Sequence, residues 1–192
     1  MKRLLFYLLG FVVLLSQSSC GYNSMVTKDQ AVKSQWADVQ NSYQRRADLI
    51  PNLVNTVKGA ANFEKSTLTD VINARAKATS VQISPDNLTP EKIKQFQEAQ
   101  SQVSAGLGRL LAVSENYPDL KANANFQELQ AQIEGTENRI NVERQKFNNV
   151  TNDYNTYIRS FPNNLFAGMF GFQQKPYFEA DASAQKAPTV QF

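Results

Sequence analysis

The chain has a single thiol, that of Cys20, and its surroundings make acylation the first chemistry to consider. Lys2 and Arg3 precede twelve residues that are all apolar or glycine, from Leu4 to Leu15. A membrane-spanning helix needs about 20 apolar residues, whereas the apolar segment of a secretory leader has roughly 7–15. Small residues then lead directly to the cysteine. This order predicts a signal peptide over residues 1–19 and a modified cysteine at the new N-terminus.

The sequence around Cys20 resembles a bacterial lipoprotein signal. That resemblance implies that the thiol carries a diacylglyceryl group, so that two or three acyl chains such as palmitate fasten the protein to a membrane. The match departs from stricter signals at Gln17, where those have leucine. Two alternatives stay open, namely ordinary cleavage after Ser18 and an uncleaved anchor that begins at Leu4.

Other reactive groups are scarce. Histidine is absent, so the commonest general base and metal ligand are both missing, and one cysteine permits neither an internal disulfide nor a thiolate zinc site. No phosphate-binding glycine loop or nucleophile-elbow motif occurs. Without Lys2 and Arg3, 18 cations face 17 anions, which gives no basis for nucleic-acid binding. We therefore expect no catalytic residue, no metal, no cofactor and no nucleic-acid partner.

The rest of the chain has the composition and periodicity of helices. Apolar residues recur at steps of three and four, which is typical of amphipathic helices. Asp48 as an N-cap with Pro51 in the first turn predicts one helix boundary, and Thr89 with Pro90 predicts another. We expect helices at about 23–46, 48–79, 89–117 and 123–161.

The last of these helices has the clearest pattern, a seam of apolar residues every seven positions. The members are Phe126, Ile133, Ile140, Phe147, Tyr154 and Phe161. Long helices with short connections favour an all-α protein, an antiparallel up-and-down four-helix bundle over residues 20–178. An irregular, aromatic-rich tail to Phe178 is expected to pack on the bundle, with lipid contact as the alternative, and residues 179–192 are expected to be disordered.

Three polar stretches carry a resemblance to a known family. They are RRADLIPNLVNTVKG from Arg45, ENYPDLKAN from Glu115, and TENRINVERQKFNN from Thr136, followed by YNTYIRSFPNN. With them, residues 22–178 are similar to the LemA family of bacterial membrane-associated proteins. The resemblance implies a helical bundle attached to a membrane by its N-terminus, with no established enzymatic activity. Family genes often neighbour those of membrane metalloproteases or other envelope proteins, which implies an adaptor role.

The expected topology places two polar turns at the end of the bundle far from Cys20. We predict a partner-binding tip there, formed by Arg45, Arg46, Asp48, Pro51, Asn52, Glu115, Tyr117, Pro118 and Asp119. The competing interpretation is that these residues only cap helices and set the hairpins. A second group is expected to form a solvated or register-setting polar layer, with a ligand site as the alternative; it contains Glu137, Asn138, Arg139, Glu143, Arg144 and Asn148.

The sequence thus predicts a lipid-anchored, non-enzymatic scaffold or adaptor of the cell envelope, facing the periplasm or the exterior. Its expected partners are membrane lipid, through acylated Cys20, and an envelope protein such as a membrane metalloprotease or a neighbouring gene product. Gly21 is not the acidic residue that retains some lipoproteins at the inner membrane, so either membrane is permitted. A spacer or membrane-shaping protein acting through the tail is one alternative. A carboxylate- and lysine-dependent hydrolase or transferase is the other, and it requires a strongly perturbed carboxylate that we do not expect.

Overall fold

The computed structural model describes residues 2–59 and 63–179, with side chains from Gly21 onward. Within these residues every regular element is helical, which confirms the all-α prediction. The elements are α1 (Lys2–Lys58), α2 (Lys65–Ser80), the 3-10 turn η1 (Pro85–Asn87), α3 (Pro90–Ser114), α4 (Pro118–Lys121), α5 (Ala124–Arg159) and α6 (Asn163–Ala167).

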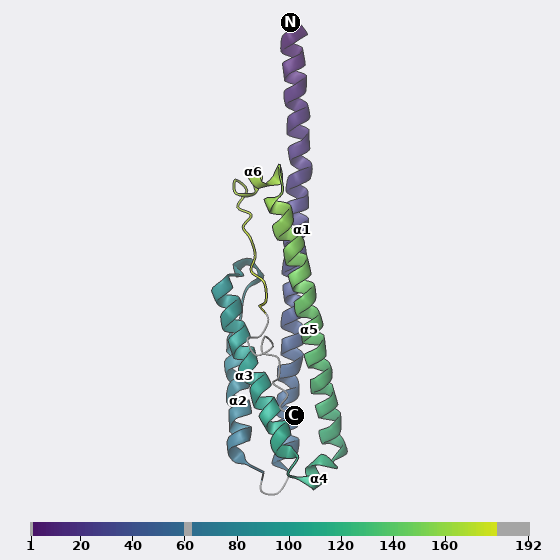
Figure 1. Ribbon diagram of the computed structural model, residues 1–192, viewed down its shortest axis with the longest axis vertical. Coiled ribbons are helices and arrows are strands. Elements are labelled where there is room, and N and C mark those ends of the chain that lie inside the picture. The colour runs from purple at the N-terminus through teal and green to yellow at the C-terminus, as the bar shows by residue number, and fades with distance from the viewer. Residues whose placement is uncertain (1, 60–62, 180–192) are drawn as a thin grey trace, which may run out of the picture.

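The helices form a long rod (Figure 1). α1 runs down its length, α2 returns beside α1, α3 descends again, and α5 climbs from the short α4 to α6. α1 pairs with α5, and α2 pairs with α3. The second pair is shorter, so it covers only the part of α1 and α5 toward α4, while the tail after α6 lies along the remaining part (Figure 1).

The predicted break between residues 46 and 48 is wrong, because α1 continues to Lys58 with Pro51 inside it. A proline within a helix leaves the carbonyl four residues earlier without its usual donor. Here that carbonyl belongs to Ala47, and Arg75 Nε of α2 donates to it at 2.7 Å. Asp48 caps nothing, since its carboxylate accepts a hydrogen bond from Gln44 Nε2 of the preceding turn, at 2.7 Å. Tertiary contact with α2 therefore keeps α1 helical through a sequence that looks like a helix start.

The remaining boundaries follow local signals more closely. Thr89 caps α3 by accepting from the Lys92 N–H, with Pro90 in the first turn, as predicted. Asn123 caps α5, where its side chain accepts from the N–H groups of Asn125 and Phe126. Pro118 does not simply stop α3, which ends at Ser114; it begins α4.

The connection between α2 and α3 lies beside the middle of α1. Trp36 Nε1 and Gln40 Nε2 both donate to the Ile83 carbonyl, at 3.0 and 3.1 Å. α2 has only 16 residues, so it reaches no farther along α1. Where α2 meets α3, a Cβ added at Gly106 would lie 3.4 Å from Val71, so the glycine permits close helix packing.

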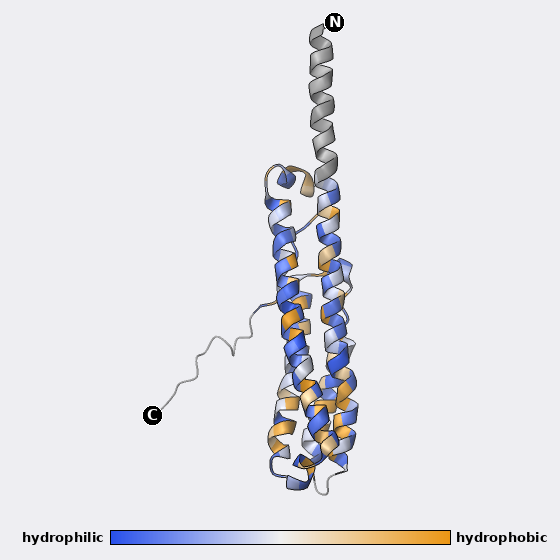
Figure 2. Cartoon of the chain, turned by 90° about the vertical axis from the view of Figure 1, so that its right-hand side faces the viewer, coloured by the Kyte–Doolittle hydropathy of each residue, from blue (hydrophilic) through white to orange (hydrophobic). Residues whose placement is uncertain are grey.

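The buried apolar residues form two clusters along the rod. The cluster toward α4, called here the aliphatic core, is mostly valine, leucine and isoleucine, including Leu53, Val57, Val71, Leu107 and Leu110. The cluster toward α6, called here the aromatic core, contains Trp36, Tyr43, Phe96, Phe147, Tyr154 and Phe178. Figure 2 shows hydrophobic residues concentrated toward the α4 end, with long hydrophilic stretches on the rest of the rod.

Candidate functional site

The structure does not bring the predicted tip residues together. One group lies within α1, away from its end, and comprises Arg45, Arg46, Asp48, Pro51 and Asn52. The other lies at the turn between α3 and α5, and comprises Glu115, Tyr117, Pro118 and Asp119. The expectation of one shared tip is wrong, because it required a turn at Arg45–Pro51 that the continuous α1 lacks. The two groups are therefore separate candidate sites.

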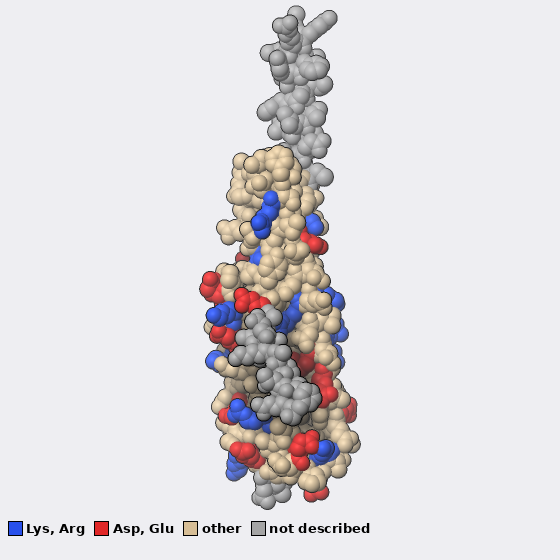
Figure 3. Space-filling view, viewed as in Figure 1, with Lys and Arg blue, Asp and Glu red and all other residues tan. Residues whose placement is uncertain are grey.

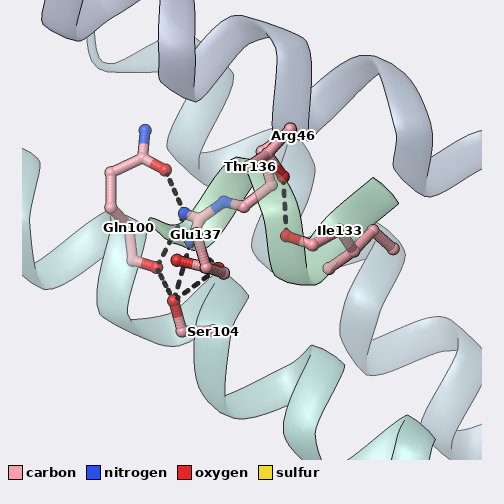
Figure 4. A network of polar contacts seen from close by, with 6 residues as sticks. All are labelled: Arg46, Gln100, Ser104, Ile133, Thr136 and Glu137. Carbon is pink, nitrogen blue, oxygen red and sulfur yellow. Dashed lines mark hydrogen bonds and ion pairs between the residues drawn. The ribbon is translucent and has the colours of Figure 1, made fainter. Parts of the chain in front are cut away.

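Arg46 is the centre of a buried polar network that joins three helices (Figure 4). Its guanidinium donates to Ser104 Oγ of α3 at 2.8 Å and to Gln100 Oε1 at 2.7 Å, with a further bond to the Gln100 carbonyl at 3.2 Å. It also forms an ion pair with Glu137 of α5. Only 2% of the Arg46 side chain is exposed, against 34% for Glu137. A cation this deeply buried is tolerated only because its donors are paired.

This network separates the two cores. In α1, Arg46 lies between Tyr43 of the aromatic core and Ile50 of the aliphatic core. In α5, Glu137 lies between Ile133 and Ile140, which belong to the aliphatic and aromatic cores respectively. A polar residue at a core position of packed helices specifies register, because a shifted register would leave it unpaired. Of the residues predicted for the polar layer, Glu137 belongs to this network, whose centre is Arg46, a residue that the sequence analysis assigned to the tip.

The other residues predicted for the polar layer follow Glu137 on α5 and differ in their exposure and contacts. Asn138 and Arg139 are exposed. Glu143 is buried and accepts from Gln35 Nε2 of α1 at 2.8 Å and from Lys146 Nζ at 3.2 Å. Burial would raise the pKa of Glu143, but these hydrogen bonds and the nearby charges of Lys146 and Arg139 outweigh burial and hold that pKa below its usual value.

Asn148 is one of two asparagines whose side chains bind the backbone of the tail, a contact that the sequence analysis did not predict. Asn148 Nδ2 donates to the Phe178 carbonyl at 3.0 Å, and its Oδ1 accepts from the Phe178 N–H at 2.8 Å. Asn155 does the same with Lys175, at 2.9 Å for both bonds. Each side-chain amide therefore pairs with a backbone peptide as a neighbouring β-strand would.

The spacing of this asparagine ladder, Asn148 and Asn155, explains why it works. Seven residues of helix rise about 10.5 Å. Three residues of extended chain, from Lys175 to Phe178, span about 10 Å. The helical heptad and the extended tail are thus in register. Two asparagines seven positions apart beside an aromatic seam are the signal that could have revealed this contact.

Further bonds fix the tail between α1, α3 and α5. The Tyr154 hydroxyl donates to the Gln173 carbonyl at 2.9 Å, and burial raises the pKa of this phenol to about 12. Gln97 Nε2 and the Arg144 guanidinium both donate to the Glu179 carbonyl at 3.0 Å. Phe178 stacks on Trp36, with 5.9 Å between ring centroids. The tail segment 172–179 therefore completes the aromatic core.

The α4 end offers a different kind of surface. Leu120 is buried beneath it, and the Tyr117 ring packs on Phe63 with centroids 5.0 Å apart. Glu115, which forms an ion pair with Lys121, is exposed together with Asn116, Pro118 and Asp119. Two buried or half-buried rings and a leucine thus hold a short exposed turn with mixed charge. A short exposed turn supported in this way is typical of a protein-contact surface.

A pocket of about 590 Å³ lies between α1, α2 and α3. Its lining combines apolar side chains with five amide side chains, Arg46 and Arg75. No carboxylate is among its lining residues within the described chain, so it offers no acid–base pair. In the described residues, no three His, Cys, Asp or Glu side chains gather as a metal site.

Comparison with known proteins decides the family. The model of the LemA family matches residues 35–192. The chain belongs to the LemA family. It is 23% identical over 158 residues to Protein LemA of Metamycoplasma hominis, an alignment that covers 82% of this chain and 68% of the relative. It is also 24% identical over 188 residues to Magnetosome protein MamQ 2 of Paramagnetospirillum magneticum, covering 89% and 69%, and 24% identical over 189 residues to Magnetosome protein MamQ of Magnetospirillum gryphiswaldense, covering 88% and 69%.

Two of the stretches that carry the LemA resemblance meet in space: the α1 stretch from Arg45 contributes Arg46, and the α5 stretch from Thr136 contributes Glu137, its ion-pair partner. The following α5 stretch, from Tyr154, supplies Asn155 of the ladder. The stretch from Glu115 forms the separate turn at α4. In this LemA-family chain the marked stretches thus contribute to the Arg46 network, the contact with the tail and the α4 turn.

Membrane attachment was predicted through Cys20, whose side chain lies outside the described part of the structure. Across the part that is described, none of the helices combines the length and hydrophobicity that a bilayer crossing requires. The predicted leader over residues 1–19 and acylation at Cys20 stay predictions, as does disorder after Glu179, because residues 180–192 are outside the described range.

Proposed function

We propose that this LemA-family protein is a lipid-anchored, non-enzymatic scaffold of the cell envelope, which presents its α4 end to another envelope protein on the periplasmic or exterior side. The observation that carries the proposal is the unbroken α1. Cys20 to Lys58 is 38 helical steps, about 57 Å at 1.5 Å per residue. A rigid helix of this length, anchored at Cys20, would hold its other end at a fixed distance from the membrane.

Packing along α1 supports rigidity over that reach. The aliphatic and aromatic cores follow one another on α1, and the Arg46 network joins α1 to α3 and α5 between them. Buried, fully paired polar networks rigidify the elements that they join. The α4 turn is therefore held at a set distance and orientation from Cys20.

The proposed contact surface is the exposed turn around Asp119, with Glu115, Asn116 and Pro118. Residues on short turns that a rigid scaffold supports are frequent binding residues. The buried Leu120 and the Tyr117–Phe63 pair give this turn such support. The LemA resemblance points to a membrane metalloprotease or another neighbouring gene product as the partner.

Anchoring is tested by labelling cells with radioactive palmitate. The wild-type protein is expected to incorporate label and the Cys20→Ser variant to incorporate none. Mass spectrometry of the purified mature protein should then find an acylated cysteine as its first residue. Absence of label from both forms would overturn the lipid anchor.

The contact surface is tested by photo-crosslinking in cells. A photoreactive residue at Asp119 is expected to capture one envelope protein, while the same residue at Lys94, exposed near the start of α3, captures none. The charge reversal Asp119→Lys, with a crosslinker at Asn116, should abolish capture without changing the helical circular dichroism. Equal capture from positions 119 and 94 would refute the α4 surface, and a spacer without a partner predicts no capture at either.

A further inference from the structure

We propose that the protein makes a second membrane contact through an apolar collar around α6, which enters the lipid interface beside Cys20. The collar consists of Tyr22, Phe161, Leu165, Met169 and Phe170. This inference rests on the proposed lipid anchor, because the anchor determines which end of the rod meets the bilayer. It assigns to that end an interaction surface whose occupant is a lipid bilayer.

The collar lies directly beside the anchoring residue. A Cβ added at Gly21 would lie 3.2 Å from Asn163 Oδ1, so the start of α6 touches the residue after Cys20. The Tyr22 ring packs edge-on against Phe170 and Phe172, with centroids 5.1 and 5.9 Å apart. Figure 1 shows α6 at the end of the rod from which the start of α1 projects. Acyl chains on Cys20 would therefore draw α6 toward the headgroups.

The apolar side chains of the collar are unusually exposed for a soluble surface. The exposed fractions are 80% for Phe161, 60% for Leu165 and 76% for Met169. Leu165 lies on α6, and Phe161 and Met169 lie just before and just after it in the chain. Gathered large apolar residues on a surface mark a contact with protein or membrane.

Charge around the collar matches an anionic lipid surface. The sequence from Tyr154 to Phe178 contains two cations, Arg159 and Lys175, and no acidic residue. Asp29, the first acidic residue after Gly21, is already paired with Lys33 at 3.0 Å and with Lys175 at 3.1 Å. Figure 3 shows the described surface near α6 almost without charge, while charged residues gather on the lower part of the rod. Anionic headgroups would thus meet cations and apolar groups without repulsion from carboxylates.

The backbone prevents these side chains from folding inward. Ala167 on α6 is buried, and its carbonyl accepts from the Phe172 N–H at 2.9 Å. Beyond it, the asparagine ladder fixes Lys175 and Phe178 against α5. The positions beneath the collar are thus filled by other residues, so the collar side chains stay exposed in the folded protein. Its proximity to Cys20 favours a bilayer over a second copy of the chain as the occupant.

The experiment uses the full, acylated protein in vesicles of phosphatidylethanolamine and phosphatidylglycerol. Met169→Cys is labelled with the fluorophore NBD, and acylation leaves Cys20 without a competing thiol. Ile72→Cys on α2 provides a matched control, because Ile72 is also an exposed apolar residue but lies far from α6 along the rod. Lipids with a spin label near the headgroup are then added to quench NBD that lies in the interface.

We expect loss of most NBD emission at position 169 and none at position 72. Leu165→Glu in the Met169→Cys background should restore the emission, while Val142→Glu, at another exposed apolar position, should not. If the protein floats with the vesicles but position 169 is quenched no more than position 72, the collar is refuted and the anchor stands. If the protein does not float, the anchor fails and the collar with it. Shielding of position 169 in detergent-free protein without vesicles would assign the patch to self-association and overturn the proposal.

Discussion

The cores of the two halves of the rod are built from different side chains and from different elements of the fold. Toward α4, the aliphatic core is formed mainly by residues of α1, α2, α3 and α5. Toward α6, the aromatic core is formed by residues of α1, the start of α3, α5 and the extended tail, with the connection before α3. The Trp36 ring contacts Phe96, Phe147 and Phe178 at centroid distances of 5.4–5.9 Å. Aromatic rings and an extended segment thus fill the place that α2 has in the aliphatic core.

The boundary between the halves is the Arg46 network, and breaking it should have the largest effect. Arg46→Ala leaves Glu137 and Gln100 without their buried partner, which is expected to cost about 3–5 kcal/mol of unfolding free energy. The measurement is urea unfolding followed by circular dichroism at 222 nm. The double variant Arg46→Met, Glu137→Met is the control, since replacing a buried ion pair by apolar groups of similar size is often neutral. Equal losses in both variants would contradict this expectation, because they would show that the polar contacts themselves stabilise the boundary and cannot be replaced by apolar groups of similar size.

The next test concerns the tail as a core element. Phe178→Ala removes a ring from the aromatic core and should cost about 3 kcal/mol, at the low end for buried phenylalanine because the tail can relax. Trp36, the only tryptophan, reports on this half through its fluorescence. Leu110→Ala in the aliphatic core should instead lower stability with little change in the native Trp36 spectrum. Identical spectra for Phe178→Ala and wild type would contradict a structural role for the tail.

A smaller loss is expected from the asparagine ladder. Asn155→Ala leaves the N–H and carbonyl of Lys175 without their partners, and an unpaired buried peptide group costs about 1–3 kcal/mol. Hydrogen exchange of the Lys175 amide should accelerate, while amides in α2 and α3 keep their protection. Asn138→Ala, at an exposed asparagine of the same helix, is the matched control and should change neither quantity.

The smallest effect should come from Glu143, which links α5 to α1 through Gln35. Because its folded pKa lies below the ordinary value of 4.5, the ionised carboxylate stabilises the fold above pH 4.5. That contribution should disappear as the pH falls through the folded pKa. Glu143→Gln should therefore have a lower urea midpoint than wild type at pH 7, with the gap closing below pH 4.5. A gap that stays constant with pH would show that the charge of Glu143 plays no part.

Local signals in the sequence were sufficient for much of the fold. The heptad seam from Phe126 to Phe161 predicted α5, although Phe161 itself lies beyond the end of the helix and is exposed. Thr89 with Pro90 predicted the start of α3. These patterns succeed because the residues that determine them are neighbours along the helix. The helix boundary predicted from Asp48 and Pro51 was wrong because the stabilising hydrogen bond from Arg75 comes from another helix. Local helix propensity contains no information about such a contact.

The candidate site was harder to predict, because it depends on which helices lie side by side. Arg46 looked like part of a turn, but the continuous α1 carries it into the core opposite Gln100 and Glu137. Asn148 was predicted to belong to a polar layer, yet its partner is the Phe178 backbone thirty residues later in the chain. Residue type indicated that these side chains needed partners, whereas only the packed structure supplies their identity.

Pro51 makes the straightness of α1 a property of the assembled molecule. The guanidinium that covers the Ala47 carbonyl belongs to α2, which follows α1 in the chain. Until α2 has docked, the Ala47 carbonyl can accept a hydrogen bond only from water, and α1 can bend at this position. The stiffness of α1 around Pro51 thus depends on the docking of α2, so the rod becomes straight only when the chain is fully folded.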